Sequence, residues 1–120
     1  MSTQAFKRKL SSSSKGDGIL ITDITGVGTP IHTATSSSTA GTYDEVWLWA
    51  YNDSTADTTL TVQFGGGDPN QTFVVSVPHR CGLIPIVPGL ILHNSGTVKA
   101  YAVVANIISV TGFVHVLSDS

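Results

Sequence analysis

The side chains able to do acid–base or metal chemistry are few in this sequence and stand far apart. Asp44 and Glu45 are neighbours in a segment that alternates like a strand, so their side chains point to opposite faces and cannot share a proton. We interpret these two carboxylates as solvated charges at the start of a strand, and the four histidines as structural. The four histidines are His32, His79, His93 and His115, and no two of them have the short spacing of a zinc-ligand pair.

A nucleophilic or phosphate-binding site is equally hard to place. Cys81 is the single cysteine, so an internal disulfide is excluded. Arg80 beside it could activate the thiol, but the sequence marks no base partner, and we expect Cys81 to be inert and buried. The nucleophile-elbow pattern G-x-S-x-G and the phosphate-binding pattern G-x-x-x-x-G-K-[ST] are both absent. We therefore expect a protein that is not an enzyme and that uses no metal or cofactor.

The strongest predicted strand, YDEVWLWAY over residues 43–51, is apolar on both faces. A strand with one solvated face alternates apolar and polar residues, so the second face here should be covered by a loop or by another subunit. We take the aromatic face as a candidate subunit interface. The two faces carry Val46, Leu48 and Ala50 on one side and Trp47, Trp49 and Tyr51 on the other.

Aromatic rings on the face of a β-sandwich also suggest carbohydrate binding, because sugars stack on Trp and Tyr rings. Trp47, Trp49 and Tyr51 therefore support a second hypothesis, a glycan- or receptor-binding module. Their place in the middle of the most apolar segment favours packing, in a core or between subunits, over sugar binding.

The rest of the chain has the period-two alternation of short strands separated by turns. We predict one all-β domain over residues 18–120, a β-sandwich or jelly-roll-like fold of about eight short strands. Segments 58–64 and 71–77 are expected to pair as a hairpin, and 97–104 and 107–116 as another. Pro85 and Pro88 predict an edge strand or a bulged crossing, because proline cannot donate to a central ladder. The remaining predicted strands are 18–25, 31–35, 43–51 and 89–93, with a loop over 36–41.

Positive charge is concentrated at the start of the chain. Four of the six Lys and Arg residues lie in the first fifteen positions, although the formal net charge of the whole chain is −2. Serines and glycines follow, so we predict a flexible basic arm over residues 1–17 with two apolar anchors. The acidic remainder of the chain argues against nucleic-acid binding. The arm residues proposed to contact a partner are Phe6, Lys7, Arg8, Lys9, Leu10 and Lys15.

Neither a signal peptide nor a membrane span is expected. The basic residues lead into SSSSKGDG rather than into an apolar core, and the apolar stretch GLIPIVPGLIL is short and broken by prolines. We predict a protein made in the cytoplasm, with no membrane partner.

Several segments together resemble small virion proteins of tailed bacteriophages, similar in character to capsid decoration (cement) proteins. They are KLSSSSKGDGI, TPIHTA, DEVWLWAYN, LTVQFGG, VSVP, VPGLIL, TVKAYA and ANIISVTGFV, which begin at Lys9 and end at Val114. The resemblance implies a jelly-roll-like subunit that forms a homotrimer on the outer surface of the phage head. Its implied partners are copies of itself and the major capsid protein, and its implied location is the virion. The terminal arm would then bind the capsid.

Overall fold

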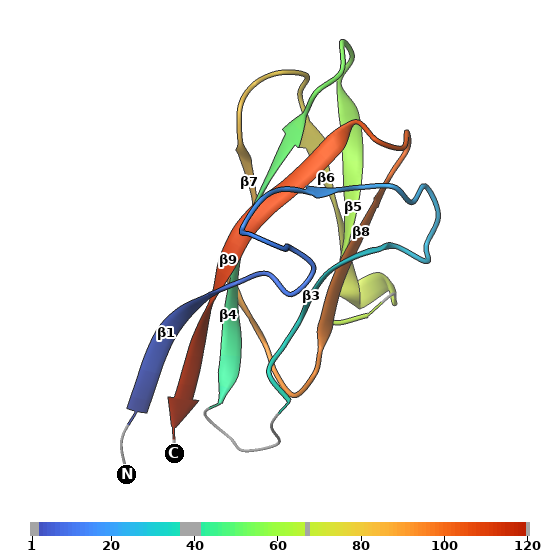
Figure 1. Ribbon diagram of the computed structural model, residues 1–120. Coiled ribbons are helices and arrows are strands. Elements are labelled where there is room, and N and C mark those ends of the chain that lie inside the picture. Colours follow the sequence, from blue (N-terminus) through green and yellow to red (C-terminus); the bar gives the residue numbers. More distant parts are fainter. Residues whose placement is uncertain (1–2, 37–41, 67, 120) are drawn as a thin grey trace.

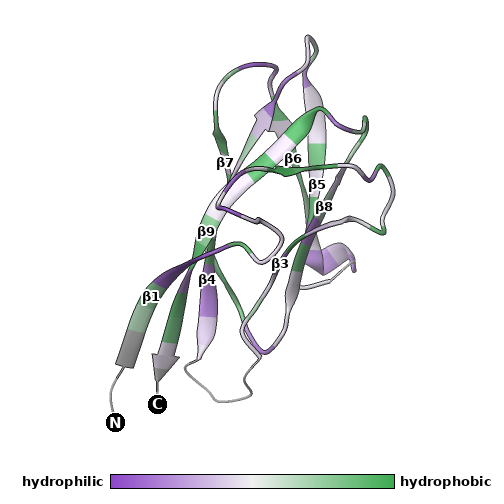
Figure 2. Cartoon of the chain, in the orientation of Figure 1, coloured by the Kyte–Doolittle hydropathy of each residue, from purple (hydrophilic) through white to green (hydrophobic). Residues whose placement is uncertain are grey.

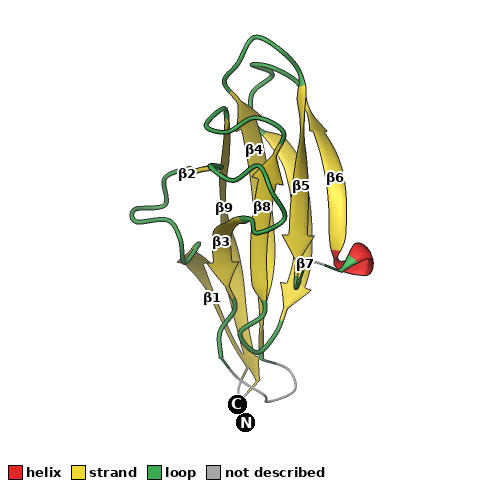
Figure 3. Cartoon of the chain, turned by 90° about the vertical axis from the view of Figure 1, so that its right-hand side faces the viewer, coloured by secondary structure: helices red, strands yellow, loops and turns green. Residues whose placement is uncertain are grey.

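The computed structural model describes residues 3–36, 42–66 and 68–119 as a sandwich of two antiparallel β-sheets (Figure 1). This confirms the predicted all-β fold. The five-stranded sheet, called sheet A here, has the order β1 (Thr3–Lys9), β9 (Ile108–Asp119), β4 (Tyr43–Asn52) and β7 (Ile84–Leu92), with β2 (Ile19–Leu20) also paired to β9. The four-stranded sheet, called sheet B, has the order β3 (Thr29–Thr33), β8 (Thr97–Ala102), β5 (Thr58–Phe64) and β6 (Thr72–Val77). A short 3₁₀ turn, η1 (Pro69–Gln71), precedes β6 (Figure 3).

The strands are connected as one long hairpin that has been rolled up. Going inward from the ends of the chain, β1 and β2 pair with β9, β3 with β8, β4 with β7, and β5 with β6. Rolling adds two further pairings, β4 with β9 and β5 with β8, which complete the two sheets. This nested order is that of a jelly roll.

Of the two predicted hairpins, one is present in the structure and the other is not. The hairpin of β5 and β6 is confirmed, with Leu60 opposite Val75. The predicted hairpin of segments 97–104 and 107–116 is wrong, because β8 and β9 lie in different sheets. The five residues between these strands, 103–107, carry the chain from one sheet to the other, and the longer-range pairings of the roll take precedence over a local hairpin.

The proline-containing segment is an edge strand, as predicted, but it continues without a break to Leu92, so the separate short strand predicted over 89–93 is wrong. β7 pairs only with β4 among the described strands, and its register shifts twice, between Val46 and Trp47 and between Leu48 and Trp49. These irregularities place Pro88 opposite Trp47 and Pro85 opposite Trp49. An edge position tolerates prolines, because only one side of the strand needs amide donors.

The core lies between the sheets and is made by alternate residues of each strand. On β4 every second side chain is buried, and Val46, Leu48 and Ala50 are at most 1% exposed. Leu60 and Val110 meet them from sheet B and from β9, and both are fully buried. Burial of this apolar set, at roughly 25 cal/mol per Å², is the main stabilising contribution.

The start of the chain differs from the flexible arm that we expected. β1 pairs with β9 over its whole length, from Thr3 opposite Asp119 to Lys9 opposite Phe113. The chain then turns inward, so that Leu10 is 1% exposed and belongs to the core. Ser12 donates its backbone N–H to the carbonyl of Ile31, which ties the segment to β3. Residues 3–13 are therefore part of the folded domain.

Candidate functional site

The outer face of sheet A, the side turned away from sheet B, carries the candidate site. On β4 the predicted interface residues Trp47, Trp49 and Tyr51 all lie on this face together with Glu45, and all four side chains are partly exposed. The β4–β9 register places Phe113 opposite Trp47 and His115 opposite Glu45. The sequence prediction of two apolar faces on this strand is confirmed, and within the monomer the second face remains partly open to solvent.

Three aromatic rings form a continuous stack across the two central strands. Phe113 lies 6.4 Å from Trp47, with the ring planes 16° apart, and 6.1 Å from Trp49, with the planes 28° apart. Such offset contacts contribute about 0.5–1.5 kcal/mol each beyond burial of area. Phe113 was not among the residues predicted for this face, although its alternation with Val114 and Val116 along β9 places it on the face opposite the core.

Polar and charged groups border the aromatic stack. Trp47 donates its indole N–H to Glu45 Oε1 at 2.7 Å, and His115 Nδ1 lies 4.0 Å from the same oxygen. Lys7 of β1 places its ammonium 5.0 Å from the centroid of the Phe113 ring, a cation–π contact. The face therefore combines an apolar centre with one carboxylate and a neighbouring lysine.

Gly89 gives Trp47 the room that it needs. A Cβ at this position would lie 2.7 Å from Cζ2 of the indole, and the glycine has a positive φ of 80°. Only a residue without a side chain combines this backbone conformation with such a close approach. The glycine in the edge strand thus sets the position of one ring of the stack.

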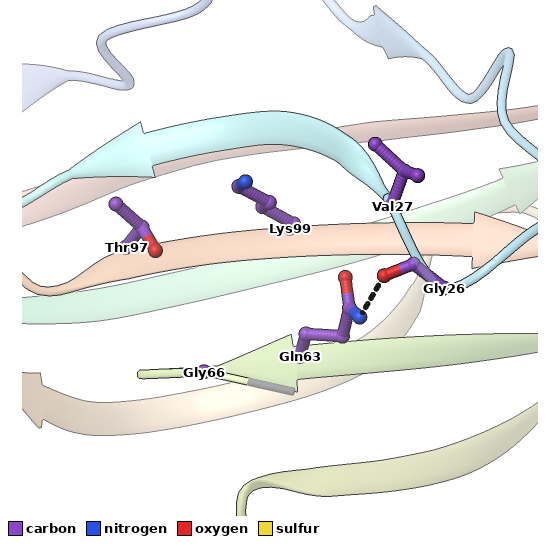
Figure 4. A pocket seen from close by; sticks show the side chains of 6 residues that line it. All are labelled: Gly26, Val27, Gln63, Gly66, Thr97 and Lys99. Carbon is purple, nitrogen blue, oxygen red and sulfur yellow. Dashed lines mark hydrogen bonds between the residues drawn. The ribbon is translucent and has the colours of Figure 1, made fainter. Parts of the chain in front are cut away.

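The outer face of sheet B has a different character. Its side chains are mostly hydroxyl-bearing or polar, and Val74 and Tyr101 are the larger apolar exceptions. A cavity of about 140 Å³ lies there beneath the loop between β2 and β3 (Figure 4). Gln63 is fixed in it by donating its amide N–H to the carbonyl of Gly26 at 2.7 Å. The other residues lining this cavity are Val27, Gly66, Thr97 and Lys99.

The residues proposed for the basic arm are divided between different environments. Lys7 and Lys9 point to the outer face of sheet A, because they lie opposite His115 and Phe113, whose side chains are on that face. Phe6 and Arg8 point to the other side, where the guanidinium lies 5.3 Å from the phenyl centroid and Phe6 is 41% exposed. Lys15 lies in the exposed turn before β2.

Leu10 cannot serve as an anchor for a partner in the folded chain, because its side chain is buried in the core. The lysines and arginine also have a structural explanation. Charged side chains on an edge strand discourage pairing with the edge of another molecule, and β1 is the outer strand of sheet A.

A buried histidine–carboxylate pair joins the two sheets, which corrects our interpretation of Asp44. His32 on β3 is 3% exposed, Asp44 on β4 is fully buried, and their Nε2 and Oδ2 atoms are 2.7 Å apart. Asp44 is therefore not a solvated charge at a strand entrance. His32 is structural, as expected, but its partner could not be found from spacing, because the two residues come from different sheets.

The hydrogen bonds around His32 define its tautomer. The backbone N–H of Ser11 donates to Nδ1 at 3.0 Å, so this nitrogen must be the acceptor. Nε2 then carries the proton and donates to Asp44. The Ser11 hydroxyl also lies 3.2 Å from Nδ1 and accepts a hydrogen bond from the backbone N–H of Thr33.

This chain of Ser11, His32 and Asp44 has the residue types of a hydrolytic triad but a different arrangement. In a triad the free imidazole nitrogen accepts the serine proton. Here that nitrogen already accepts a backbone N–H at a shorter distance than the hydroxyl. The hydrogen bonds of Ser11 with His32 and Thr33 instead attach the segment after β1 to β3.

A second histidine–aspartate pair is exposed on the surface. His79 Nδ1 lies 2.6 Å from Asp57 Oδ1, and the His79 backbone N–H donates to the same oxygen. The hydrogen bond from the His79 ring, and to a lesser degree the one from the His79 backbone, lowers the pKa of Asp57 from its ordinary value. The hydroxyl of Ser13 likewise lowers the pKa of Asp17. Cys81 is exposed, contrary to our expectation, because it lies in the turn between β6 and β7.

Within the described ranges, no set of three or more His, Cys, Asp and Glu side chains is arranged to hold a metal ion. The same part of the chain has no helix of the length and apolarity that crossing a membrane requires. Comparison of the chain with family models, curated proteins and solved structures gave no match. The site therefore has to be interpreted from its own geometry.

Proposed function

We propose that the chain is a structural virion protein, a capsid decoration protein that binds the outer surface of a phage head as a homotrimer and stabilises contacts between major capsid subunits. The observation that carries this proposal is the open aromatic face of sheet A. Interfaces between permanently associated subunits resemble a protein core cut in half, and aromatic residues are enriched in them. The similarity of the sequence segments to such virion proteins gives the proposal its biological setting.

The two outer faces of the sandwich support the choice of interface. Sheet A presents the stack of Trp47, Trp49 and Phe113, whereas sheet B presents mainly threonine and other polar side chains. The partner we assign to the aromatic face is a second copy of the chain.

β1 is the surface we assign to the capsid. Arg8 and Phe6 lie together on the side of this strand turned away from the aromatic face, where Arg8 is exposed and Phe6 adds apolar area beside it. Lys7 lies on the opposite side, over the ring of Phe113. Lys9 is less available, because its ammonium donates to the carbonyl of Ser13 at 2.7 Å. A trimer would present three such strands, so contacts that are individually weak would act together.

Charge reversal on β1 tests the capsid contact. The variant Arg8→Glu, on the side of β1 away from the aromatic face, should co-sediment with capsids of the phage that encodes the chain at least tenfold less than the wild type. Lys99→Glu, on the side of sheet B, is the matched control and should bind normally. Undiminished binding of Arg8→Glu would show that β1 is not the capsid contact. Urea unfolding of each variant checks that the domain is folded.

A glycan-binding module is the second candidate, because the rings of Trp47 and Trp49 are partly exposed and lie side by side with Phe113. Jelly rolls occur in lectins as well as in viral capsids, so the fold is compatible with both candidates. On a glycan array, this candidate predicts a signal for the wild type that is lost in Trp49→Ala. No signal for the folded wild type would eliminate it.

A further inference from the structure

A second apolar surface lies at the edge of the sandwich beside β2, away from the aromatic stack. It belongs to the loop between β2 and β3 and to the loop between β8 and β9, which lie side by side (Figures 1 and 2). Four of the ten large apolar side chains that are exposed in the described part of the chain are found on these loops, and we call them the loop patch. They are Ile24, Val27, Val103 and Val104, with exposures of 57%, 72%, 70% and 51%.

Backbone hydrogen bonds hold the two loops together, so the side chains of the loop patch are carried by a defined backbone. The N–H of Ala102 donates to the carbonyl of Asp23 at 3.1 Å, which brings Ile24 next to Val103. The N–H of Asn106 donates to the carbonyl of Ile21 at 2.9 Å. Single exposed aliphatic residues need no explanation, but a group of this size on adjoining loops indicates a contact surface.

One acidic group lies within this patch. The carboxylate of Asp23 makes no hydrogen bond or ion pair with any other described residue, although its backbone groups are both engaged. It is partly buried next to Ile24. A surface that covers the loop patch therefore has to bring a cation to Asp23, because burying an unpaired carboxylate is costly.

The outer face of sheet A has both an apolar surface that could cover the loop patch and a cation that could pair with Asp23. Its centre is the apolar stack of Trp49, Phe113 and Trp47, and its border carries the lysine of β1, Lys7, which has no carboxylate partner among the described residues. A copy of the loop patch placed on this face would bury its aliphatic side chains against the rings. It would also bring Asp23 of one copy toward Lys7 of the next.

Symmetry gives a reason for two different surfaces. A two-fold dimer uses one surface twice, whereas a ring of three subunits requires each subunit to present two distinct and complementary surfaces. We propose that the loop patch is the second half of the subunit interface, and that it binds the outer face of sheet A on the next copy to close the ring. This inference rests on the proposed homotrimer and specifies how it is built.

Mixing two variants tests this inference. Trp49→Glu removes the aromatic face but keeps the loop patch, and Val103→Glu does the reverse. At a concentration where the wild type is a trimer, light scattering should give each variant alone the 12.5 kDa mass of a single chain. An equimolar mixture should contain a species of twice that mass, since one intact interface can form between the two variants.

Leu83→Glu, at a residue that is 57% exposed in the turn before β7, is the matched control and should remain a trimer. Val104→Glu replaces Val103→Glu if circular dichroism shows that the latter is not folded. A trimeric loop-patch variant, or a mixture that stays at the single-chain mass, would overturn the inference. A wild type that is itself monomeric would instead contradict the proposed homotrimer.

Discussion

Replacing Asp44 by alanine is expected to lower the free energy of unfolding by about 1–3 kcal/mol, the cost of leaving a buried hydrogen-bond donor unsatisfied. The variant leaves the Nε2–H of His32 without an acceptor at a position where the histidine is 3% exposed. It also weakens the link between β3 and β4, and with it the attachment of Ser11 to His32. Urea unfolding at neutral pH, followed by the fluorescence of Trp47 and Trp49, measures the effect.

Asp57→Ala is the matched control for this measurement. It removes the same type of pair, with His79, from the surface, where the Asp57 side chain is 65% exposed. Solvent screens such a pair, so this variant should unfold at nearly the urea concentration of the wild type. If both variants unfold at the same concentration, the buried pair does not have the structural role described here.

Replacing Trp49 by glutamate should lower the apparent affinity for capsids by about a hundredfold or more. A charge on the aromatic face prevents association of the subunits, and a single subunit attaches through one β1 strand instead of three. Loss of simultaneous attachment reduces avidity by far more than any change at β1 itself. Co-sedimentation with capsids over a range of protein concentrations gives the affinity.

Val74→Glu is the control for the aromatic face, since Val74 is an apolar residue on the outer face of sheet B with 66% exposure. It should bind capsids as the wild type does. Equal binding by the Trp49 and Val74 variants would show that attachment to the capsid does not depend on the aromatic face.

The fold was predictable where alternation is local and regular. Leu60 and Val62 alternate with threonines along β5, and β4 likewise has one buried face, as its alternation predicted. The cover predicted for the aromatic face of β4 is not supplied by a loop of the described chain, in which Trp47 and Trp49 are partly exposed. β1 could not be found in this way. It lies at the edge of sheet A, and with Lys7 on one face and Arg8 on the other it has no apolar alternation.

The pairing of distant residues was the other part that the sequence could not supply. His32 and Asp44 meet because the rolled hairpin places β3 and β4 in opposite sheets with their side chains pointing inward. Phe113 joins the tryptophans because β9 lies beside β4, an arrangement that the predicted local hairpin of β8 and β9 did not contain. Such contacts depend on topology, which short-range patterns do not specify.

The mass of the wild-type chain in solution tests the central proposal most directly, because the aromatic face is assigned to contact between copies. Light scattering behind size-exclusion chromatography should give three times the 12.5 kDa of the single chain. The trimer should persist in high salt, since an apolar interface does not depend on exposed charges. A mass of 12.5 kDa at every concentration measured would contradict the proposal that the outer face of sheet A is a subunit interface.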